Sequence, residues 1–211
     1  MKTLFIIFLI TSLVRPINSI AEISFVNNEL PWSLKLRTAY FLPADKKVRK
    51  IYSDAWPDYQ FELSKLINNR FAVWSHIGWN SITGSALSCE GEEVSRNKTT
   101  LFMVPFSLGI NYNFPLQIDN ASFYLGAGGS STFVRITDHS EFVKKHRTKN
   151  GAFGGVLKSG FQYWFKNNIF IDVFADYSFL SVHFHERNNN VENSNACLSG
   201  LNLGIGLGSY F

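Results

Sequence analysis

The sequence predicts an all-β fold: an eight-stranded antiparallel up-and-down transmembrane β-barrel. Three observations support this prediction: segments in which apolar and polar residues alternate, connections that are alternately long and short, and a last segment that ends on an aromatic residue. Successive side chains of a strand point to opposite faces, so the alternation gives each segment an apolar and a polar face. In a membrane barrel these two faces contact lipid and the lumen.

The first 21 residues have the features of a cleaved signal peptide. Lys2 precedes an apolar run over residues 4–14, which is too short to span a bilayer as a stable helix. Small residues at Ser19 and Ala21 suit a signal peptidase. An uncleaved N-terminal anchor is the alternative. Residues 22–211 are expected to form one barrel domain, with no apolar run long enough for a membrane helix.

The composition limits the function classes. Hydrophobic residues make up 45% of the chain and aromatic residues 16%, with 20 Phe. The chain has 20 basic and 16 acidic residues, and loss of Lys2 and Arg15 with the signal peptide would halve this excess. A net charge so close to zero gives no argument for a nucleic-acid partner. No cofactor is indicated.

The alternating segments define eight expected strands. They are residues 32–41, 59–67, 70–82, 99–114, 121–134, 152–165, 169–182 and 198–211. The long connections are residues 42–58, 83–98, 135–151 and 183–197. The short connections between them are mostly rich in Asn, which favours tight hairpin turns. Membrane barrels have this arrangement, with short periplasmic turns and long external loops. Pro105 removes a ladder donor from the fourth strand, where we expect a bulge or a local fault.

The last twelve residues alternate most regularly. Their odd positions, from Leu201 to Phe211, are mostly apolar, and four of the six even positions are glycines. Four glycines would destabilise a helix, whereas a strand places them together on one face. We expect that face to line the lumen and to leave space for the long side chains opposite.

The polar face of the expected strands collects charges of both signs. Its charged residues are Lys35, Arg37, Glu62, Lys158, Asp172 and Asp176, with His76 on the same face. The lumen of an eight-stranded barrel is only wide enough for side chains to fill. Since an isolated buried charge is costly, we expect opposite charges to pair there and to plug the lumen.

With these residues in view, residues 32–211 resemble the small eight-stranded outer-membrane β-barrels of the OmpA/OmpX type. The closing strand carries most of the resemblance, and residues 151–163, with the tight turn and the Asp-bearing strand after them, are also similar. The resemblance implies the outer membrane of a Gram-negative-type bacterium, and contact with outer-membrane lipids and lipopolysaccharide. Tyr210 and Phe211 look like the assembly signal that the barrel assembly machinery reads. We therefore expect the protein to have a structural or surface-interaction role. A small-solute channel of the OmpW type and a soluble periplasmic barrel are alternatives.

One motif leaves an enzymatic alternative open, although we expect no enzyme. Outer-membrane lipid A deacylases are barrels that carry the motif His-x-Ser-Asn-Ala near their last strand. Here Ser194-Asn195-Ala196, just before the expected last strand, is similar to the end of that motif. A Ser nucleophile needs an adjacent His base, but Glu192 stands where the motif has His. His183 or His185 could approach from across the loop. Their period-two spacing also suits two metal ligands, but no third ligand stands at a convincing spacing. A polar, Asn-rich loop is the simpler interpretation.

Two of the expected external loops are basic. The first holds Lys46, Lys47, Arg49 and Lys50, and the third holds Lys144, Lys145, Arg147 and Lys149. Such clusters attract polyanions. They would contact phosphates of the surrounding lipid, or bind a polyanionic surface or host ligand.

Cys89 and Cys197 both fall in expected external loops. The oxidising cell envelope favours a disulfide between them, with an intermolecular bond as the alternative.

Overall fold

The computed structural model describes residues 31–90, 93–116, 120–138, 147–165, 168–184 and 194–211. The predicted signal peptide lies outside these residues. The described chain forms one short helix, α2 (Lys46–Ile51), and the following strands: β1 (Trp32–Pro43), β2 (Trp56–Leu66), β3 (Phe71–Glu90), β4 (Glu93–Pro115), β5 (Ala121–Asp138), β6 (Arg147–Trp164), β7 (Ile169–Phe184), β8 (Ser194–Cys197) and β9 (Gly200–Tyr210).

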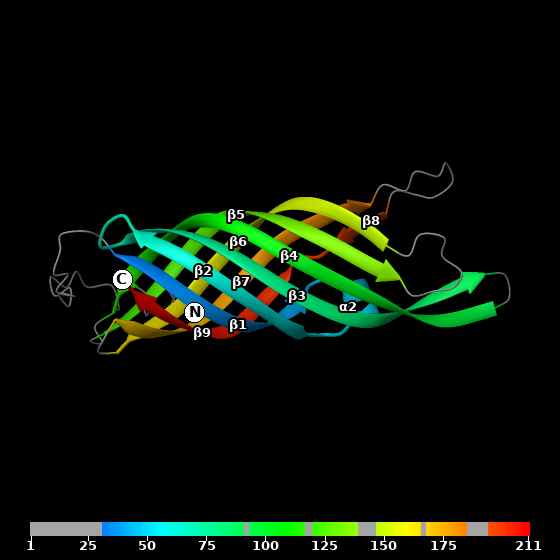
Figure 1. The fold of residues 1–211 in the computed structure, drawn as a ribbon, viewed down its shortest axis with the longest axis horizontal. Helices are drawn as coiled ribbons and strands as arrows, with labels where there is room; N and C mark the ends of the chain where they lie inside the picture. Colours follow the sequence, from blue (N-terminus) through cyan, green and yellow to red (C-terminus); the bar gives the residue numbers. More distant parts are fainter. Residues whose placement is uncertain (1–30, 91–92, 117–119, 139–146, 166–167, 185–193) are drawn as a thin grey trace, which may run out of the picture.

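The strands close into an antiparallel barrel (Figure 1). Each strand from β1 to β7 pairs with the next, and β9 pairs with both β7 and β1. β8 pairs with β7 in the same register as β9. The two therefore form one strand of the barrel, here called the last stave, which is interrupted at Leu198 and Ser199. With β8 and β9 counted as one strand, the expected fold of eight antiparallel strands is confirmed. Residues 194–197, which we expected in a loop, instead begin the last stave.

Short turns join the strands at one end of the barrel, here called the turn end. Between β2 and β3, the Asn68 side-chain oxygen accepts hydrogen bonds from the backbone N–H groups of Arg70 and Phe71, both at 2.8 Å. Asn120 and Asn168, which precede β5 and β7, have positive φ values of 63° and 62°. Asn tolerates this region better than most residues, which explains why the short connections are rich in it.

The opposite end, here called the loop end, carries longer strands than expected. β3 and β4 remain paired as far as Glu90 and Glu93, so most of the expected loop 83–98 is a hairpin that projects beyond the other strands (Figure 1). β5 and β6 shorten the expected loop 135–151 in the same way. Pairing between strands satisfies backbone groups that a loop would leave to water, which favours the extension.

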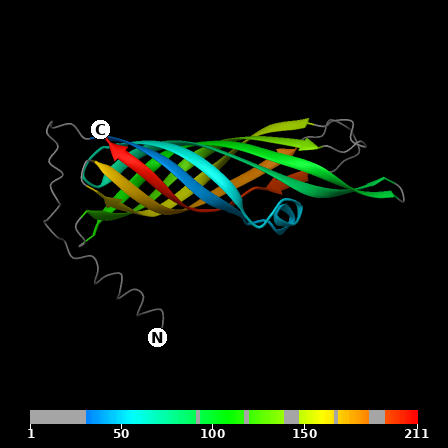
Figure 2. The same cartoon turned by 60° about the horizontal axis from the view of Figure 1, so that its bottom comes forward.

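Helix α2 occupies the first long connection at the loop end (Figure 2). Asp45 caps its N-terminus, where the carboxylate accepts a hydrogen bond from the Lys47 backbone N–H at 2.7 Å. Among the described residues, no helix has the length and apolar character needed to cross a membrane.

Burial along the strands follows the expected alternation. In β1, Leu36 and Tyr40 are exposed, whereas Lys35 and Arg37 are buried in the lumen. Aromatic side chains gather on the outer face near both ends. Those near the turn end include Trp32, Phe71, Tyr163, Phe165 and Phe211, and those towards the loop end include Tyr40, Tyr59, Trp79 and Phe179. This distribution is typical of the aromatic girdles of membrane barrels.

Pro105 causes a local fault rather than a bulge. Gly78 and Trp79 have no partner in the β3–β4 ladder, and the pairing resumes at Asn80 in the same register. On its other side, β4 keeps its pairing with β5 through Pro105 itself. A Cβ atom on Gly78 would lie 3.1 Å from Pro105 Cγ, so the glycine leaves space for the proline ring.

Candidate functional site: an ion-paired lumen

Six charged side chains meet inside the barrel, and all are buried. This lumen cluster comprises Lys35, Arg37, Glu62, Lys158, Asp172 and Asp176. Glu62 is 0% exposed and binds three bases. Its Oε1 accepts a hydrogen bond from Lys35 Nζ at 2.7 Å, and its Oε2 accepts one from Arg37 Nη1 at 3.1 Å. Lys158 Nζ also pairs with Oε2. Lys35 and Glu62 meet because they are Cα partners across β1 and β2.

Arg37 connects Glu62 to the acids of β7. Its Nη1 lies 2.9 Å from Asp176 Oδ2, and its Nε lies 3.2 Å from Asp172 Oδ2. Its Nη2 donates a hydrogen bond to the Tyr124 hydroxyl at 3.3 Å, and this hydroxyl donates one to Asp172 Oδ2, also at 3.3 Å. A guanidinium can serve several acceptors at once because it carries five N–H donors. The lumen cluster has three bases and three acids, and therefore no net charge.

Aromatic rings surround the bases of the lumen cluster. The Arg37 guanidinium carbon lies 3.4 Å from the centre of the Phe174 ring, and Lys158 Nζ lies 4.2 Å from that of Trp74. Such cation–π contacts stabilise a charge that has lost its water. The rings fill the lumen beside the ion pairs, so this level of the barrel is packed with side chains.

Among the glycines of β9, Gly206 provides space for the lumen cluster, whereas Gly204 lies against Ala39 and Gly208 against Phe170. Gly206 is the Cα partner of Arg37 on β1 and of Asp172 on β7. A Cβ atom on Gly206 would lie 2.9 Å from Arg37 Cγ and 3.5 Å from Asp172 Cβ. A side chain at this position would therefore displace the guanidinium from its partners.

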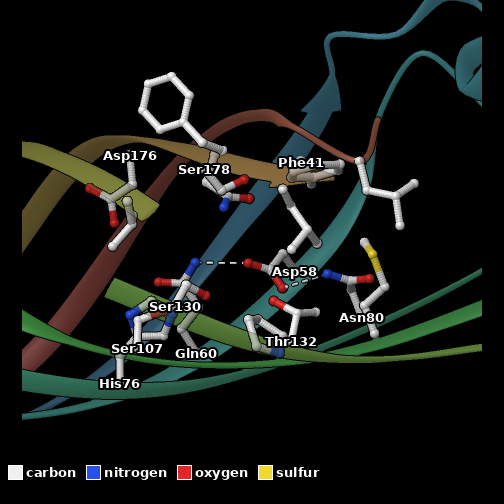
Figure 3. Close-up of a pocket in the computed structure, with 17 residues that line it drawn as sticks. Phe41, Asp58, Gln60, His76, Asn80, Ser107, Ser130, Thr132, Asp176 and Ser178 are labelled. Atoms are coloured by element: carbon white, nitrogen blue, oxygen red, sulfur yellow. Dashed lines mark hydrogen bonds between the residues drawn. The ribbon is translucent and has the colours of Figure 1, made fainter. Parts of the chain in front are cut away.

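A cavity of about 40 Å³ lies beside the lumen cluster, towards the loop end; it is here called the polar cavity after its polar residues, although more of its lining surface is apolar than polar. The polar residues along it include Asp58, Gln60, His76, Asn80, Ser107, Ser130, Thr132, Asp176, Ser178 and Asn202. Figure 3 shows Asp58 between Gln60 and Asn80, joined to each by a hydrogen bond. A volume of this size holds a few water molecules at most.

An apolar layer, here called the apolar cap, lies on the loop-end side of the lumen cluster. Its buried residues are Phe41, Val48, Trp56, Leu101, Met103, Val134, Ala152, Leu180, Val182 and Leu198. Val48 comes from α2, so the helix is anchored to the barrel through this layer. Phe41 and Met103 border the polar cavity as well. The prediction of a polar lumen face is therefore wrong at this level, because the inward positions become apolar towards the loop end.

A second cavity, of about 10 Å³, lies on the turn-end side of the lumen cluster. Lys35 borders this cavity, whereas Asp176 borders the polar cavity. The lumen cluster thus lies between the two spaces.

The basic residues of the first loop lie on α2. Lys46, Lys47 and Lys50 are exposed, and Arg49 is partly exposed. In the third loop, Lys144 and Lys145 lie outside the described residues, Arg147 begins β6, and Lys149 is exposed. The structure therefore places one basic group on a defined surface at the loop end.

The residues of the deacylase alternative are only partly described. Ser194 pairs with Phe184 in the β7–β8 ladder, and Asn195 pairs with His183. His185 and Glu192 lie outside the described residues. In the part of the chain that the structure describes, no three His, Cys, Asp or Glu residues form a group that could hold a metal ion.

The candidate disulfide between Cys89 and Cys197 stays a prediction, because the Cys89 side chain lies outside the part that the structure describes. Cys197 is an exposed free cysteine, and its Sγ lies 3.4 Å from Ser199 Oγ. Cys89 pairs with Val94 near the end of the β3–β4 hairpin. In the barrel, β1 and β2 lie between β3 and the strand that carries Cys197.

The chain end closes the barrel. The Phe211 backbone N–H donates to the Trp32 carbonyl at 2.9 Å, and the Trp32 N–H donates to the Phe211 carbonyl at 3.0 Å. The Phe211 side chain is 69% exposed on the outer face. The Tyr210 ring instead contacts Phe170, at 5.0 Å between ring centres.

Sequence reasoning missed some of the polar residues of the lumen. The expected strand bounds place Asp58 in a loop, and the alternation by itself does not distinguish Tyr124 or Asn80 from other inward residues. The period-two spacing of Asp58, Gln60 and Glu62 was the available signal, because it continues the lumen face of β2 by two residues.

No protein-family model matches the chain, and no curated protein matches it. Several solved structures do have a similar fold. Neisserial surface protein A has 13% sequence identity and a TM-score of 0.56, over 85% of this chain and 97% of that one. Ail of Yersinia pestis, in complex with the heparin analogue sucrose octasulfate, has 13% identity and a TM-score of 0.51, over 87% and 99%. Outer membrane protein W of E. coli has 10% identity and a TM-score of 0.52, over 87% and 98%. The chain therefore has the fold of the small eight-stranded outer-membrane barrels.

Proposed function

We propose that the protein is an integral outer-membrane barrel with a closed lumen and a structural or surface-interaction role. The observation that carries this proposal is the contrast between the two faces of the barrel. The outer face is a belt of exposed apolar and aromatic side chains, whereas the charges of the strands pair inside. Only a barrel surrounded by lipid gains from this arrangement, because a soluble barrel would bury its apolar face.

The outer membrane of a Gram-negative-type bacterium is the proposed location. The chain would reach it by export behind a cleaved signal peptide and by insertion through the barrel assembly machinery. The turn end would then face the periplasm, and α2 with the long hairpins would face outwards among lipopolysaccharide. Two measurements test the location: fractionation of the two membranes, and electrophoretic migration with and without heating. A folded barrel migrates differently before heating, and recovery of the protein in the soluble fraction would contradict the proposal.

A closed lumen predicts that the purified protein conducts no steady ionic current in a planar lipid bilayer. The lumen cluster and the apolar cap both support this expectation. Stable, reproducible conductance steps would favour the small-solute channel. The absence of a catalytic role is tested with Ser194→Ala, which should leave lipid A acylation in the producing cells unchanged.

The surface-interaction role rests on α2. Its exposed lysines carry positive charge at the loop end, and no acidic residue stands in its first turn. Such a patch attracts anionic groups in a salt-dependent manner. The proposed ligand class is a polyanion, either the phosphates of surrounding lipopolysaccharide or a sulfated or phosphorylated surface glycan. The structure of Ail with sucrose octasulfate shows that a barrel of this fold has been observed with such an anion.

Binding of the folded protein to immobilised heparin tests this role. Lys46→Gln with Lys47→Gln should weaken binding and reduce its salt dependence. Lys65→Gln with Arg70→Gln is the matched control, because it removes the same charge from exposed positions near the turn end. Equal loss in the two double variants would mean that the patch on α2 is not the binding surface.

A further inference from the structure

The polar cavity holds a buried carboxylate that the lumen cluster does not neutralise. Among the buried residues that the structure describes, the carboxylates are Asp58, Glu62, Asp172 and Asp176, and the permanent bases are Lys35, Arg37 and Lys158. The lumen cluster balances its own charges, so Asp58 carries the excess. Asp58 is 2% exposed, and a buried carboxylate without a counter-charge is strongly unfavourable.

The described hydrogen-bond partners of Asp58 are amides, not bases. Its Oδ2 accepts a hydrogen bond from Gln60 Nε2 at 2.7 Å, and its Oδ1 accepts one from Asn80 Nδ2 at 3.0 Å (Figure 3). Two N–H donors on the two oxygens favour the ionised carboxylate, whereas burial, the larger effect, opposes ionisation, so a bound cation would have to supply the missing counter-charge. Gln60 Oε1 in turn accepts from Arg37 Nη1 at 3.1 Å, but Arg37 is already shared among the acids of the lumen cluster.

The lining of the polar cavity also offers acceptors that lack donors. Asn80 Oδ1 and Asp176 Oδ1 are buried and have no hydrogen-bond partner among the described residues. Asn80 is 4% exposed and Asp176 is 1% exposed. Both residues border the polar cavity, as do the hydroxyl-bearing Ser107 and Thr132. Buried acceptors are rarely left unsatisfied, so each of these oxygens is expected to bind water or a cation; Figure 3 shows Asn80 and Asp176 on opposite sides of Asp58.

We propose that the polar cavity binds a monovalent metal cation of the size of Na⁺. One positive charge matches the excess of one carboxylate, whereas a divalent ion would exceed it. Hard cations prefer carboxylate, amide and hydroxyl oxygens, which Asp58, Asn80 and the neighbouring side chains provide. The volume of about 40 Å³ accommodates a small ion with water but excludes a large organic cation. The site is separate from the surface role proposed for α2.

Thermal unfolding of the full, folded protein in detergent tests the site. The midpoint is compared in sodium chloride and in choline chloride at equal ionic strength, because choline is too large for the cavity. A ligand that binds only the folded state raises the midpoint, by about 3–6 °C when its concentration is ten times its dissociation constant. Asp58→Asn removes the excess charge, so the difference between the two salts should disappear. Asp54→Asn, at an exposed position just before β2, should retain it.

Equal midpoints of the wild-type protein in the two salts would overturn the proposal, as would an Asp58→Asn protein that keeps the sodium effect. The ¹³C NMR signal of the Asp58 carboxyl gives a second measurement, which does not depend on folding of the variant. We expect an ionised carboxylate at neutral pH whose shift changes when choline replaces sodium. A protonated carboxyl would overturn the proposal, because a proton would then neutralise the site.

Discussion

Arg37 and Gly206 are partners across β1 and β9, and the guanidinium network exists because Gly206 has no side chain. A Cβ atom there would lie 2.9 Å from Arg37 Cγ and 3.2 Å from the Leu36 carbonyl oxygen. Contacts this short force a neighbour to move. Arg37 is held by three carboxylates and cannot move freely, so the glycine sets the position of the base that joins β1 to β7.

We predict that Gly206→Ala destabilises the folded barrel by about 1–3 kcal/mol, the usual cost of an overpacked core. The measurement is urea unfolding in detergent or lipid vesicles. Gly129→Ala, in β5, is the matched control, because its Cβ would meet no atom within 4 Å. We expect this control to unfold like the wild type. An equal loss in both variants would mean that backbone effects of glycine, not the space beside Arg37, determine the result.

Glu62→Gln should destabilise the barrel more strongly. The change leaves the three bases of the lumen cluster with only the two aspartates of β7 as ion-pair partners, and removing one partner of a buried ion pair costs about 3–5 kcal/mol. Unfolding of Glu62→Gln, Lys158→Met and the double variant forms a cycle that measures their coupling. We expect the double variant to lose less unfolding free energy than the sum of the two single losses. Additive losses would show that Lys158 and Glu62 do not stabilise each other.

The faces of the strands could be predicted from the sequence, whereas the partners of each charge could not. Alternation assigns Lys35, Arg37 and Glu62 to the lumen without knowledge of register, because period two depends only on the strand itself. That Glu62 meets Lys158, which is distant in sequence, depends on the closure of the barrel and on the register of every intervening strand pair.

The apolar cap and helix α2 were missed for a different reason. We expected a polar lumen along the whole barrel, although Phe41, Leu180 and Val182 already stand at inward positions of their strands. A short helix such as α2 leaves little trace in sequence, because its single buried residue, Val48, shows no periodicity. Packing against the barrel, not helix propensity, holds it in place.

The anchoring of α2 through Val48 can be tested with Val48→Asp. A buried charge in the apolar cap should detach the helix while the barrel remains closed, since the strands pair with one another and not with α2. Trypsin cleavage at the basic residues of α2 should then accelerate about tenfold or more, which corresponds to a local opening free energy lowered by at least about 1.4 kcal/mol. Ile51→Asp, at an exposed position of the same helix, should change the rate little. A similar acceleration in both variants would show that Val48 is not the anchor.

A substitution at Phe211 can distinguish a role in assembly from a role in stability. The described hydrogen bonds of Phe211 to Trp32 involve only backbone atoms, and its side chain is 69% exposed on the outer face, so Phe211→Ala keeps the barrel closed. We expect its unfolding free energy to fall by no more than about 2 kcal/mol, the scale of one aromatic side chain transferred from lipid. If Phe211 acts as an assembly signal, the folded fraction in cell membranes should fall several-fold, measured as heat-modifiable protein. Ser209→Ala, on the same face of β9, should leave that fraction unchanged. Wild-type assembly of Phe211→Ala in cells would refute the signal, whereas parallel losses in cells and in vitro would assign the effect to stability.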